Sequence, residues 1–301
     1  MPPFSPHYIL AKDGTRLRTA VFEASPKHGV CVLLHGQTEF IEKYFEVIGE
    51  LGERGFTVAT FDWRGQGGSA RLLANPLKAH VGDFAEYDDD LTSFLEQVVK
   101  PLSPKPLALA HSMGGHILLR TLHDKPGAFA AAAFSAPMLG ISARGFPTPL
   151  VRLVTTLQTA FGQADEFAWG MAARDPRLVD FNTQLCTSDR ARFARTQEIV
   201  KANPSIRLAG PTWGWIEATH RSMARVTAPG FAESIQTPLL IVGAGRDRIV
   251  RVEAERDFVR RLPHGTYLEL ADAEHEILME SDAIRARFWG AFDEFVGLSY
   301  S

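Results

Sequence analysis

Short apolar runs recur along the first half of the chain, separated by longer stretches of mixed polarity. Four of these runs are nearly continuous in apolar residues, at Val30–Leu34, Phe56–Phe61, Leu107–Ala110 and Ala130–Phe134. Strands that are covered on both faces of a parallel sheet lose the polar alternation of half-exposed strands. The pattern therefore predicts four buried strands in the first half of the chain.

The stretches between these runs have the spacing of amphipathic helices. They lie at Tyr44–Arg54, Phe84–Val99 and Gly114–His123, and a glycine or a proline, which commonly ends a helix, follows each of them. Near the N-terminus, Tyr8–Ala11 and Leu17–Phe22 flank an Asp-Gly turn and predict a β-hairpin. Strands that alternate with helices predict βαβ units and a mostly parallel sheet, which is the α/β class.

The rhythm changes after Pro137. Between residues 140 and 232 there is no buried strand pattern, and helices are predicted at Phe161–Ala173 and Trp213–Met223. The alternation of strands and helices then resumes, at Leu239–Val242, Val252–Leu262, Tyr267–Leu270 and Ile284–Val296. We therefore predict one α/β core domain, residues 1–139 and 233–301, interrupted by a helical insertion at 140–232.

The composition is that of a globular protein, but the charge is unevenly divided. Of 301 residues, 45% are hydrophobic and 22% are charged, which excludes disordered, collagen-like and coiled-coil chains. A net charge of -3 offers no overall basic surface for nucleic acid. The insertion carries 11 Lys and Arg against 7 Asp and Glu, and the remainder carries 21 against 28. The basic insertion either faces something anionic or holds arginines solvated on helix surfaces.

Cysteine usage and the start of the chain bear on the compartment. The two cysteines, Cys31 and Cys186, are too few for a disulfide framework, so free thiols in a reducing compartment are expected. The first residues show neither a basic nor an apolar signal-peptide segment. No apolar stretch approaches the roughly 20 residues of a membrane span. We expect a cytoplasmic protein whose membrane contact, through the insertion, would be peripheral.

The strongest chemical motif is a serine between a buried strand and a helix. Leu107–Ala110 leads into His111-Ser112-Met113-Gly114, with a second glycine following. A nucleophile on such a sharp turn has a strained backbone and needs small neighbours two residues away on each side, here Ala110 and Gly114. A serine that merely caps the helix would not explain the glycines. Ser112 is therefore the predicted nucleophile.

A serine needs a base, and the base needs an acid that orients it. In α/β enzymes with this elbow the acid and then the histidine follow the serine along the chain. Asp247 follows the strand Leu239–Val242, and His275 follows Tyr267–Leu270. Both come after the carboxyl ends of strands, the edge where such sheets place their sites. We predict Asp247 as the acid and His275 as the base.

Other acids and histidines fit these roles less well. Asp272 and Glu274 are alternative acids, but they are too close to His275 in sequence to reach round its ring easily. His264 precedes its strand and belongs to the opposite edge. His111 is the variable residue of the elbow, and its side chain is expected to point away from the site. His220 lies in the insertion and is expected at the surface or in a helix cap.

An oxyanion hole needs two N–H donors that point at the developing charge. The backbone N–H of Met113, directly after the nucleophile, is the first predicted donor. The second is the backbone N–H of Gln37, in the loop His35-Gly36-Gln37-Thr38-Glu39 that follows a buried strand. A metal site is not predicted, because His111, His116 and His123 are five and seven residues apart and lack the i, i+4 spacing of a helical ligand pair.

Four motifs together resemble the α/β-hydrolase superfamily, over essentially the whole chain. Within it they are similar to the lysophospholipase L2 and monoacylglycerol lipase group, also classed as serine aminopeptidase-like (S33) hydrolases. The motifs are His35–Glu39 followed by Lys43-Tyr44, Phe61–Ser69, the serine elbow, and Glu274–Leu278. Alanine in place of the first glycine of the elbow is the one departure. Asp62 and Arg64 are expected to hold a structural loop rather than to bind phosphate.

The resemblance implies an eight-stranded, mostly parallel sheet flanked by helices. It also implies that 140–232, between the sixth and seventh strands, forms a cap over the site, and that the enzyme uses no metal and no organic cofactor. Aromatic and methionine side chains of the insertion would attach it to the core or line an apolar tunnel. They are Phe146, Phe161, Phe167, Trp169, Met171, Phe181, Phe193, Trp213, Trp215 and Met223.

These observations predict a serine hydrolase that cleaves carboxylic esters through an acyl-enzyme, acting on lysophospholipids or monoacylglycerols. The basic insertion would suit a phosphate head group or an anionic membrane surface. One alternative is a short-chain carboxylesterase or an aminopeptidase, the latter using Glu166, Glu198 or Glu217 to bind a substrate amine. Another is a ligand-binding protein that keeps the fold, but such proteins often lose a triad member, and here none is lost.

Overall fold

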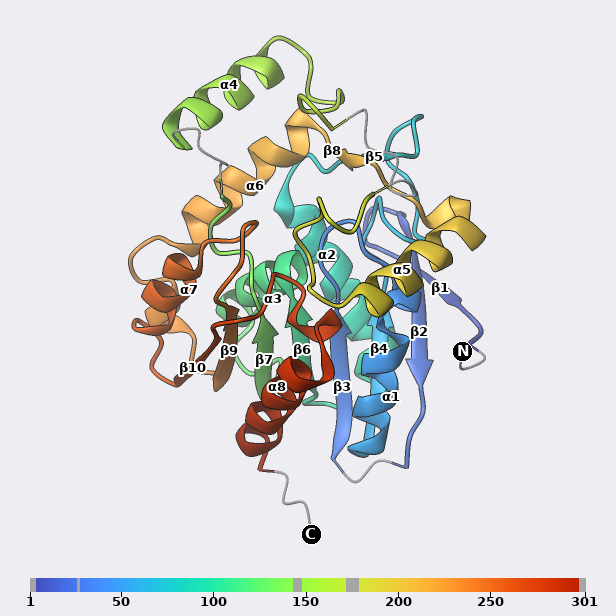
Figure 1. Cartoon of the computed structure of the whole chain (residues 1–301), viewed down its shortest axis with the longest axis vertical. Coiled ribbons are helices and arrows are strands. Elements are labelled where there is room, and N and C mark those ends of the chain that lie inside the picture. The colour runs from blue at the N-terminus through green and yellow to red at the C-terminus, as the bar shows by residue number, and fades with distance from the viewer. Residues whose placement is uncertain (1–3, 26–27, 143–147, 172–178, 298–301) are drawn as a thin grey trace.

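The computed structural model describes residues 4–25, 28–142, 148–171 and 179–297. Its centre is an eight-stranded sheet with the order β1-β2-β4-β3-β6-β7-β9-β10 (Figure 1). The strands are β1 His7–Leu10, β2 Arg16–Phe22, β3 Gly29–Leu34, β4 Phe56–Phe61, β6 Leu107–His111, β7 Ala131–Ser135, β9 Leu239–Ala244 and β10 Gly265–Leu270. Only the β1–β2 and β2–β4 pairs are antiparallel. This confirms the predicted hairpin and the mostly parallel sheet.

Helices cover both faces of the sheet. Helices α1 (Phe45–Glu53) and α8 (Asp282–Phe295) pack on one face, and α2 (Phe84–Phe94), α3 (Ser112–Asp124) and α7 (Val252–Val259) pack on the other. The inner strands β4 and β9 are buried along their whole length, as their largely apolar sequences predicted. The sheet is therefore the middle layer of three.

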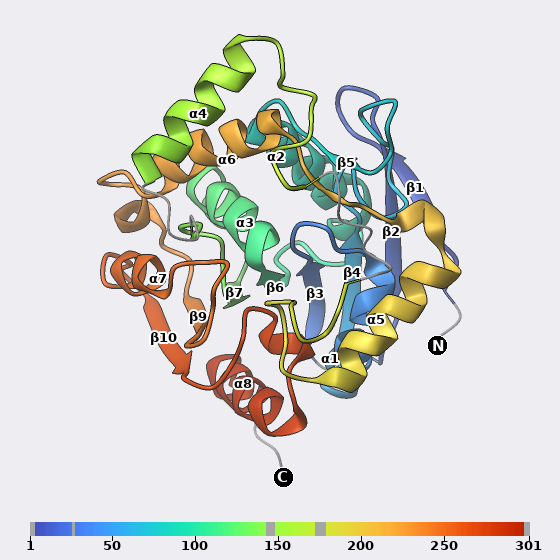
Figure 2. The same cartoon turned by 45° about the horizontal axis from the view of Figure 1, so that its top comes forward.

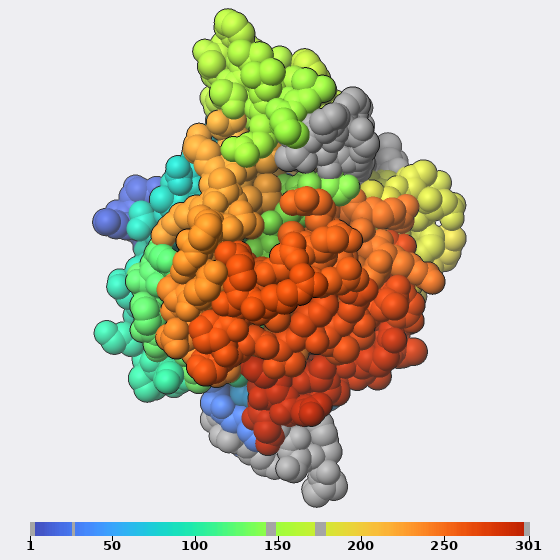
Figure 3. All heavy atoms as spheres, turned by 90° about the vertical axis from the view of Figure 1, so that its left-hand side faces the viewer, coloured from blue at the N-terminus to red at the C-terminus, as the bar shows by residue number. Residues whose placement is uncertain are grey.

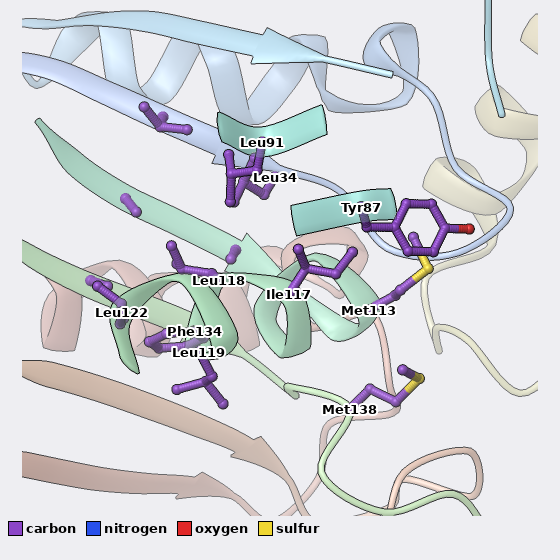
Figure 4. Close-up of a cluster of buried hydrophobic side chains, with 14 of the residues drawn as sticks. Leu34, Tyr87, Leu91, Met113, Ile117, Leu118, Leu119, Leu122, Phe134 and Met138 are labelled. Atoms are coloured by element: carbon purple, nitrogen blue, oxygen red, sulfur yellow. The ribbon is translucent and has the colours of Figure 1, made fainter. Parts of the chain in front are cut away.

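Helix α3 is the most deeply buried of the helices that cover the sheet. Its side chains Ile117, Leu118 and Leu119 are buried in the cluster that also contains Leu34 and Phe134 of the sheet (Figure 4). Burial of a leucine or isoleucine side chain contributes about 1.5–3 kcal/mol. The helix that begins at Ser112 is consequently held firmly against the sheet, which limits movement of its first turn.

The insertion contains three described α-helices, α4 (Thr148–Ala160), α5 (Arg190–Ala202) and α6 (Trp213–Val226). The helix predicted at Trp213–Met223 is confirmed. The helix predicted at Phe161–Ala173 is wrong, because the chain forms turns from Phe161 to Met171, and residues 172 and 173 lie outside the described ranges. Gly162 and Gly170 adopt φ angles of 79° and 77°, which interrupt a helix. The helix lies before this segment instead, and Phe146 is also outside the described residues.

The insertion is joined to the core at several places (Figure 2). Helix α6 buries Trp215, Ala218 and Val226 in the same apolar cluster as α3. The two-residue strand β8 (Gly210–Pro211) pairs with β5 (Lys78–Ala79), which precedes α2. By contrast, α4 stands out from the rest of the molecule (Figure 3). The domain division at 140 and 232 stays a prediction. Helix α6 lies inside the predicted insertion but packs like a helix of the core.

Helix α5 is attached mainly by charge, with a small apolar contact to Phe40. Arg192 donates two hydrogen bonds to Glu46 of α1, of 2.6 and 3.0 Å, and a third, of 2.6 Å, to Asp282 at the start of α8. Only Ile199 and Val200 of this helix are buried. Within the described ranges, no helix combines the length and the hydrophobicity that a membrane span requires.

Candidate active site

The nucleophile candidate lies on a strained turn at the carboxyl edge of the sheet. Strand β6 ends at His111 and α3 begins at the next residue, Ser112, whose φ angle is 49°. A non-glycine residue in this region costs on the order of 1–3 kcal/mol and persists only where its surroundings enforce it. Here the carbonyl oxygen of Ser112 accepts a 3.0 Å hydrogen bond from the backbone N–H of Met138. The side chain is therefore presented at the N-terminus of α3.

Gly114 is required by the close approach of strand β3. A β-carbon at this position would lie 2.5 Å from the carbonyl oxygen of His35 and 2.7 Å from that of Leu34. Both obstacles are backbone atoms, which cannot rotate away. The sequence expectation of a small residue two positions after the serine thus has a direct steric cause. Ala110, two positions before the serine, is buried inside β6.

The structure brings Ser112, His275 and Asp247 together in a hydrogen-bonded chain. His275 Nε2 lies 2.9 Å from Ser112 Oγ, and its Nδ1 lies 2.5 Å from Asp247 Oδ2. The other oxygen of Asp247 accepts backbone N–H bonds from Ile249 and Val250, of 2.7 and 2.8 Å. Three residues separated by up to 163 positions therefore have the geometry of a nucleophile, a base and an orienting acid.

The alternative acids have other partners. Asp272 pairs with Arg287, and Glu274 lies 3.4 Å from Arg248. His264 lies at the amino end of β10, where its carbonyl oxygen accepts from the N–H of Leu239. These positions leave His275 and Asp247 as the pair that faces Ser112.

Charge around His275 favours its protonated form. Burial of the imidazole acts to lower its pKa, but the charge of Asp247 and its hydrogen bond raise the pKa of His275 above the ordinary value, and Glu276 and Glu39 act in the same direction. Burial acts to raise the pKa of Asp247, yet His275 and the two backbone N–H groups lower it below its usual range. Asp247 is thus a carboxylate that stabilises a positive charge on His275.

His111 departs from the sequence expectation. Its side chain was expected to point away from the site, but its ring centroid lies 4.8 Å from that of His275. The Nδ1 atom of His111 is 3.0 Å from the carbonyl oxygen of Ser135, which holds the ring across the end of β7. Burial lowers the pKa of His111 to about 4, so this neighbour of His275 is neutral near pH 7. The direction of the His111 ring depends on its contact with Ser135, the last residue of β7. The sequence near residue 111 does not show that β7 ends beside it.

The loop after β3 lies directly beside Ser112. A β-carbon on Gly36 would be 3.1 Å from Ser112 Cβ. Trp63 Nε1 donates a 2.9 Å hydrogen bond to the carbonyl oxygen of His35, and Thr38 N–H donates one of 2.5 Å to Gln66 Oε1. Within the described part of the chain, the backbone N–H groups of Gln37 and Met113 donate to no other group. The two predicted oxyanion donors therefore remain candidates for that role.

The motif Phe61–Ser69 holds the loop after β3 through hydrogen bonds to its backbone. Asp62 Oδ1 accepts from the backbone N–H of Ile41 at 2.9 Å, and its Oδ2 accepts from Arg18 Nε at 2.6 Å and from Gly68 N–H at 2.7 Å. Sequence reasoning expected Asp62 to hold a loop but missed Gln66 and the pair Glu39 and Lys43. The four-residue spacing of that acid and base was the available signal.

Among the described residues, no three His, Cys, Asp or Glu side chains lie together as metal ligands would.

Comparisons with known proteins agree with the observed fold and identify related proteins. A family model described as serine aminopeptidase, S33, matches residues 25–282. Lysophospholipase L2 of Escherichia coli strain K12 is 34% identical over 284 residues, which cover 91% of this chain and 82% of that protein. A monoacylglycerol lipase of Mycolicibacterium smegmatis is 26% identical over 268 residues, 86% of this chain and 84% of that protein. A crystal structure of a monoglyceride lipase variant from Saccharomyces cerevisiae shares the fold, with a TM-score of 0.76 at 19% identity, and covers 99% of this chain and 97% of that chain.

We expect Gly114→Ala to lower the free energy of unfolding by roughly 1–3 kcal/mol, because the new methyl group meets backbone carbonyls. To relieve this clash, α3 would have to move away from β3, which would displace Ser112 and lower kcat. Gly49→Ala on α1 is the matched control, because its β-carbon meets no atom within 4 Å, and it should stabilise the helix by about 0.5–1 kcal/mol. Urea unfolding of both variants measures this, and equal stability of Gly114→Ala and the wild type would contradict the steric argument.

A second acid, Glu255 on α7, is fully buried near Asp247. No cation pairs with it within the described ranges, and its carboxyl lies near the hydroxyl of Tyr267, both flanking Gly243. Burial raises the pKa of Glu255 well above its ordinary value, and the charge of Asp247 adds to this effect. The folded protein therefore holds a proton here that the unfolded chain releases above about pH 4.3.

The free energy of unfolding should consequently fall as the pH rises from about 4.3 toward the raised pKa of Glu255. Glu255→Gln keeps the shape and cannot ionise, so its stabilisation relative to the wild type should grow between pH 5 and pH 8, to the order of 1 kcal/mol or more. Thermal or urea unfolding across this range measures the effect. Stability curves of the two proteins that stay parallel from pH 5 to pH 8 would contradict it.

Proposed function

Because this chain belongs to the serine aminopeptidase S33 family of α/β hydrolases, we propose that it hydrolyses the carboxylic ester of lysophospholipids or monoacylglycerols through an acyl-enzyme. The observation that carries the proposal is the hydrogen-bonded chain from Ser112 through His275 to Asp247. Family membership confirms the resemblance seen in the sequence motifs. The substrate class follows the names of the relatives, a lysophospholipase and a monoacylglycerol lipase.

The geometry supports a two-step mechanism. Ser112 Oγ attacks the acyl carbonyl while His275 Nε2 takes its proton, and Asp247 stabilises the resulting imidazolium. The backbone N–H groups of Gln37 and Met113 stabilise the oxyanion. His275 then gives its proton to the leaving glycerol oxygen, which departs and leaves an acyl group on Ser112. A water molecule, deprotonated by His275, attacks the acyl-enzyme. His275 then returns this proton to Ser112 Oγ as the ester bond breaks and the fatty acid leaves.

Apolar side chains next to Ser112 suit an acyl chain. Met113 and Met138 lie at the end of the core cluster beyond the strands (Figure 4), and both are buried. The thioether side chain of methionine is flexible and polarisable, so it adapts to irregular apolar ligands. No comparable observation favours an aminopeptidase, since Glu166 pairs with Lys78 at 2.8 Å. Glu198 is exposed on α5, and Glu217 Oε2 accepts from Thr156 at 3.2 Å.

We expect Ser112→Ala to reduce fatty acid release from lysophosphatidylcholine and monoolein by roughly 10⁴-fold or more, because no nucleophile remains. Ser103→Ala, a serine near the opposite edge of the sheet, is the matched control and should keep the wild-type rate. A series of p-nitrophenyl esters against an amino-acid anilide separates lipase, short-chain esterase and aminopeptidase activity. Equal fatty acid release by the wild type and Ser112→Ala would refute the mechanism.

We further propose that the outer face of α4 contacts a lipid surface. Leu150, Leu153 and Leu157 repeat at spacings of three and four residues, which places them on one side of the helix, and Phe161 follows directly after its last residue. They are between 45% and 77% exposed, whereas Thr155 on the side facing α6 is buried. A basic insertion beside such an apolar face is typical of helices that bind anionic membranes from the side.

Leu153→Glu is expected to weaken binding to phosphatidylglycerol-containing vesicles by about tenfold, since it removes on the order of 1.5 kcal/mol of apolar burial. Leu102→Glu is the matched control: Leu102 is also an exposed leucine, 43% against 56%, but it lies outside the insertion. Vesicle co-sedimentation measures binding, and thermal unfolding confirms that both variants fold. Equal binding by both variants would contradict a role for α4.

A further inference from the structure

A buried lysine joins the loop beside the nucleophile to the loop of the base. Lys43 Nζ lies 2.7 Å from Glu39 Oε1 and 2.7 Å from Glu276 Oε1. The exposed fractions of these three side chains are 6%, 4% and 13%. Buried charges cost several kcal/mol each unless they are paired and hydrogen-bonded. A cluster of three therefore persists only where its geometry is well satisfied, and we call it the Lys43 cluster.

One end of the Lys43 cluster holds the oxyanion loop. Glu39 Oε2 accepts hydrogen bonds from the backbone N–H of Gly36 and from the hydroxyl of Tyr44, the latter at 2.8 Å. Gly36 precedes Gln37, whose N–H is a proposed oxyanion donor. The carboxylate of Glu39 therefore sets the orientation of the peptide group next to that donor.

The other end of the cluster holds the loop of His275. Glu276 follows His275 directly, and its backbone N–H donates a 2.7 Å hydrogen bond to the carbonyl oxygen of Cys186. Its own carbonyl oxygen accepts from Met279 N–H at 2.7 Å. Because both the backbone and the carboxylate of Glu276 are bound, the residue can transmit the position of Lys43 to His275.

The Lys43 cluster also carries a net negative charge, with two carboxylates and one ammonium. The groups that face His275 are Asp247, Glu39 and Glu276, all negative, together with the neutral ring of His111. Lys43 lies between the two glutamates, and burial together with the charge of Glu276 keeps the nearby Cys186 thiol neutral. Asp247 is thus not the only negative group that acts on the imidazole.

We propose that Glu39, Lys43 and Glu276 are positioning residues of the hydrolase reaction, which fix the oxyanion loop relative to His275 and stabilise its imidazolium. This inference rests on the proposed function. When His275 takes the proton of Ser112, the bond between Oγ and hydrogen breaks and a positive ring forms beside the cluster. The net negative charge of the cluster favours this proton transfer. Lys43, which is paired with both glutamates, fixes the position of the Gln37 N–H relative to His275.

The test is the pH profile of kcat/KM for a soluble p-nitrophenyl ester. Glu276→Gln keeps the shape but removes a negative charge, so it should move the acidic limb to lower pH and lower the plateau rate by roughly tenfold. Lys43→Met removes a positive charge and should move the limb to higher pH. Shifts in opposite directions are a signature that a purely structural role would not produce.

Glu274→Gln is the matched control. Glu274 also neighbours His275 in sequence, but its carboxylate lies near Arg248 and outside the Lys43 cluster. Its acidic limb should coincide with that of the wild type. If Lys43→Met does not fold, Glu39→Gln takes its place and should move the limb in the same direction as Glu276→Gln.

Labelling of Ser112 by a fluorophosphonate separates the two proposals. If the wild type is labelled and the limbs of Glu276→Gln, Glu274→Gln and the wild type coincide, the inference about the Lys43 cluster is wrong. If wild-type Ser112 is not labelled and no ester is cleaved, the proposed function itself fails. If wild-type Ser112 is labelled and the acidic limbs of Glu276→Gln and Lys43→Met shift in opposite directions, both the proposed function and the inference about the Lys43 cluster are supported.

Discussion

The left-handed backbone of Ser112 is the constraint on which the rest of the site depends. A residue with φ near 49° is held only if the strand before it and the helix after it cannot move. The buried leucines and isoleucine of α3 provide this on one side, and the backbone of β3, which Gly114 allows to approach, provides it on the other. The strain at one residue is thus offset by the packing of a whole helix, and the hydroxyl is presented at a helix N-terminus.

Buried charges act together with apolar contacts to hold the remaining loops at that hydroxyl. Asp247 is held by two backbone N–H groups and in turn orients His275, while Lys43 joins two carboxylates from loops more than 230 residues apart in sequence. Buried ions tolerate little displacement, because each loses its partner within a short distance. Val250 beside Asp247, and Ile277 and Leu278 after His275, anchor the same loops in the apolar clusters.

The insertion divides its roles along its length. Helix α6 packs into the core cluster and α5 is held by Arg192 to Glu46, so both are fixed to the body of the molecule. Helix α4 keeps an exposed apolar face on a segment that stands away from it. The proposed chemistry therefore belongs to the sheet edge, whereas contact with a lipid surface would belong to α4. The excess of basic residues in the insertion would suit contact with an anionic lipid surface. Arg192 does not contribute to it, because it is paired with Glu46 and Asp282 within the protein.

The sequence by itself determined the buried strands and the helices that flank them, because apolar periodicity and turn chemistry act over a few residues. It also predicted Ser112, Asp247 and His275 as a triad, because each follows the carboxyl end of a predicted strand. The structure alone decided features that depend on distant segments: the position of α4 before Gly162, the ring of His111 against His275, and the attachment of the polar helix α5. The bridge from Lys43 to Glu276 belongs to the same group. Local patterns indicate which residues form an element, but only the packed chain determines which loops meet at its edge.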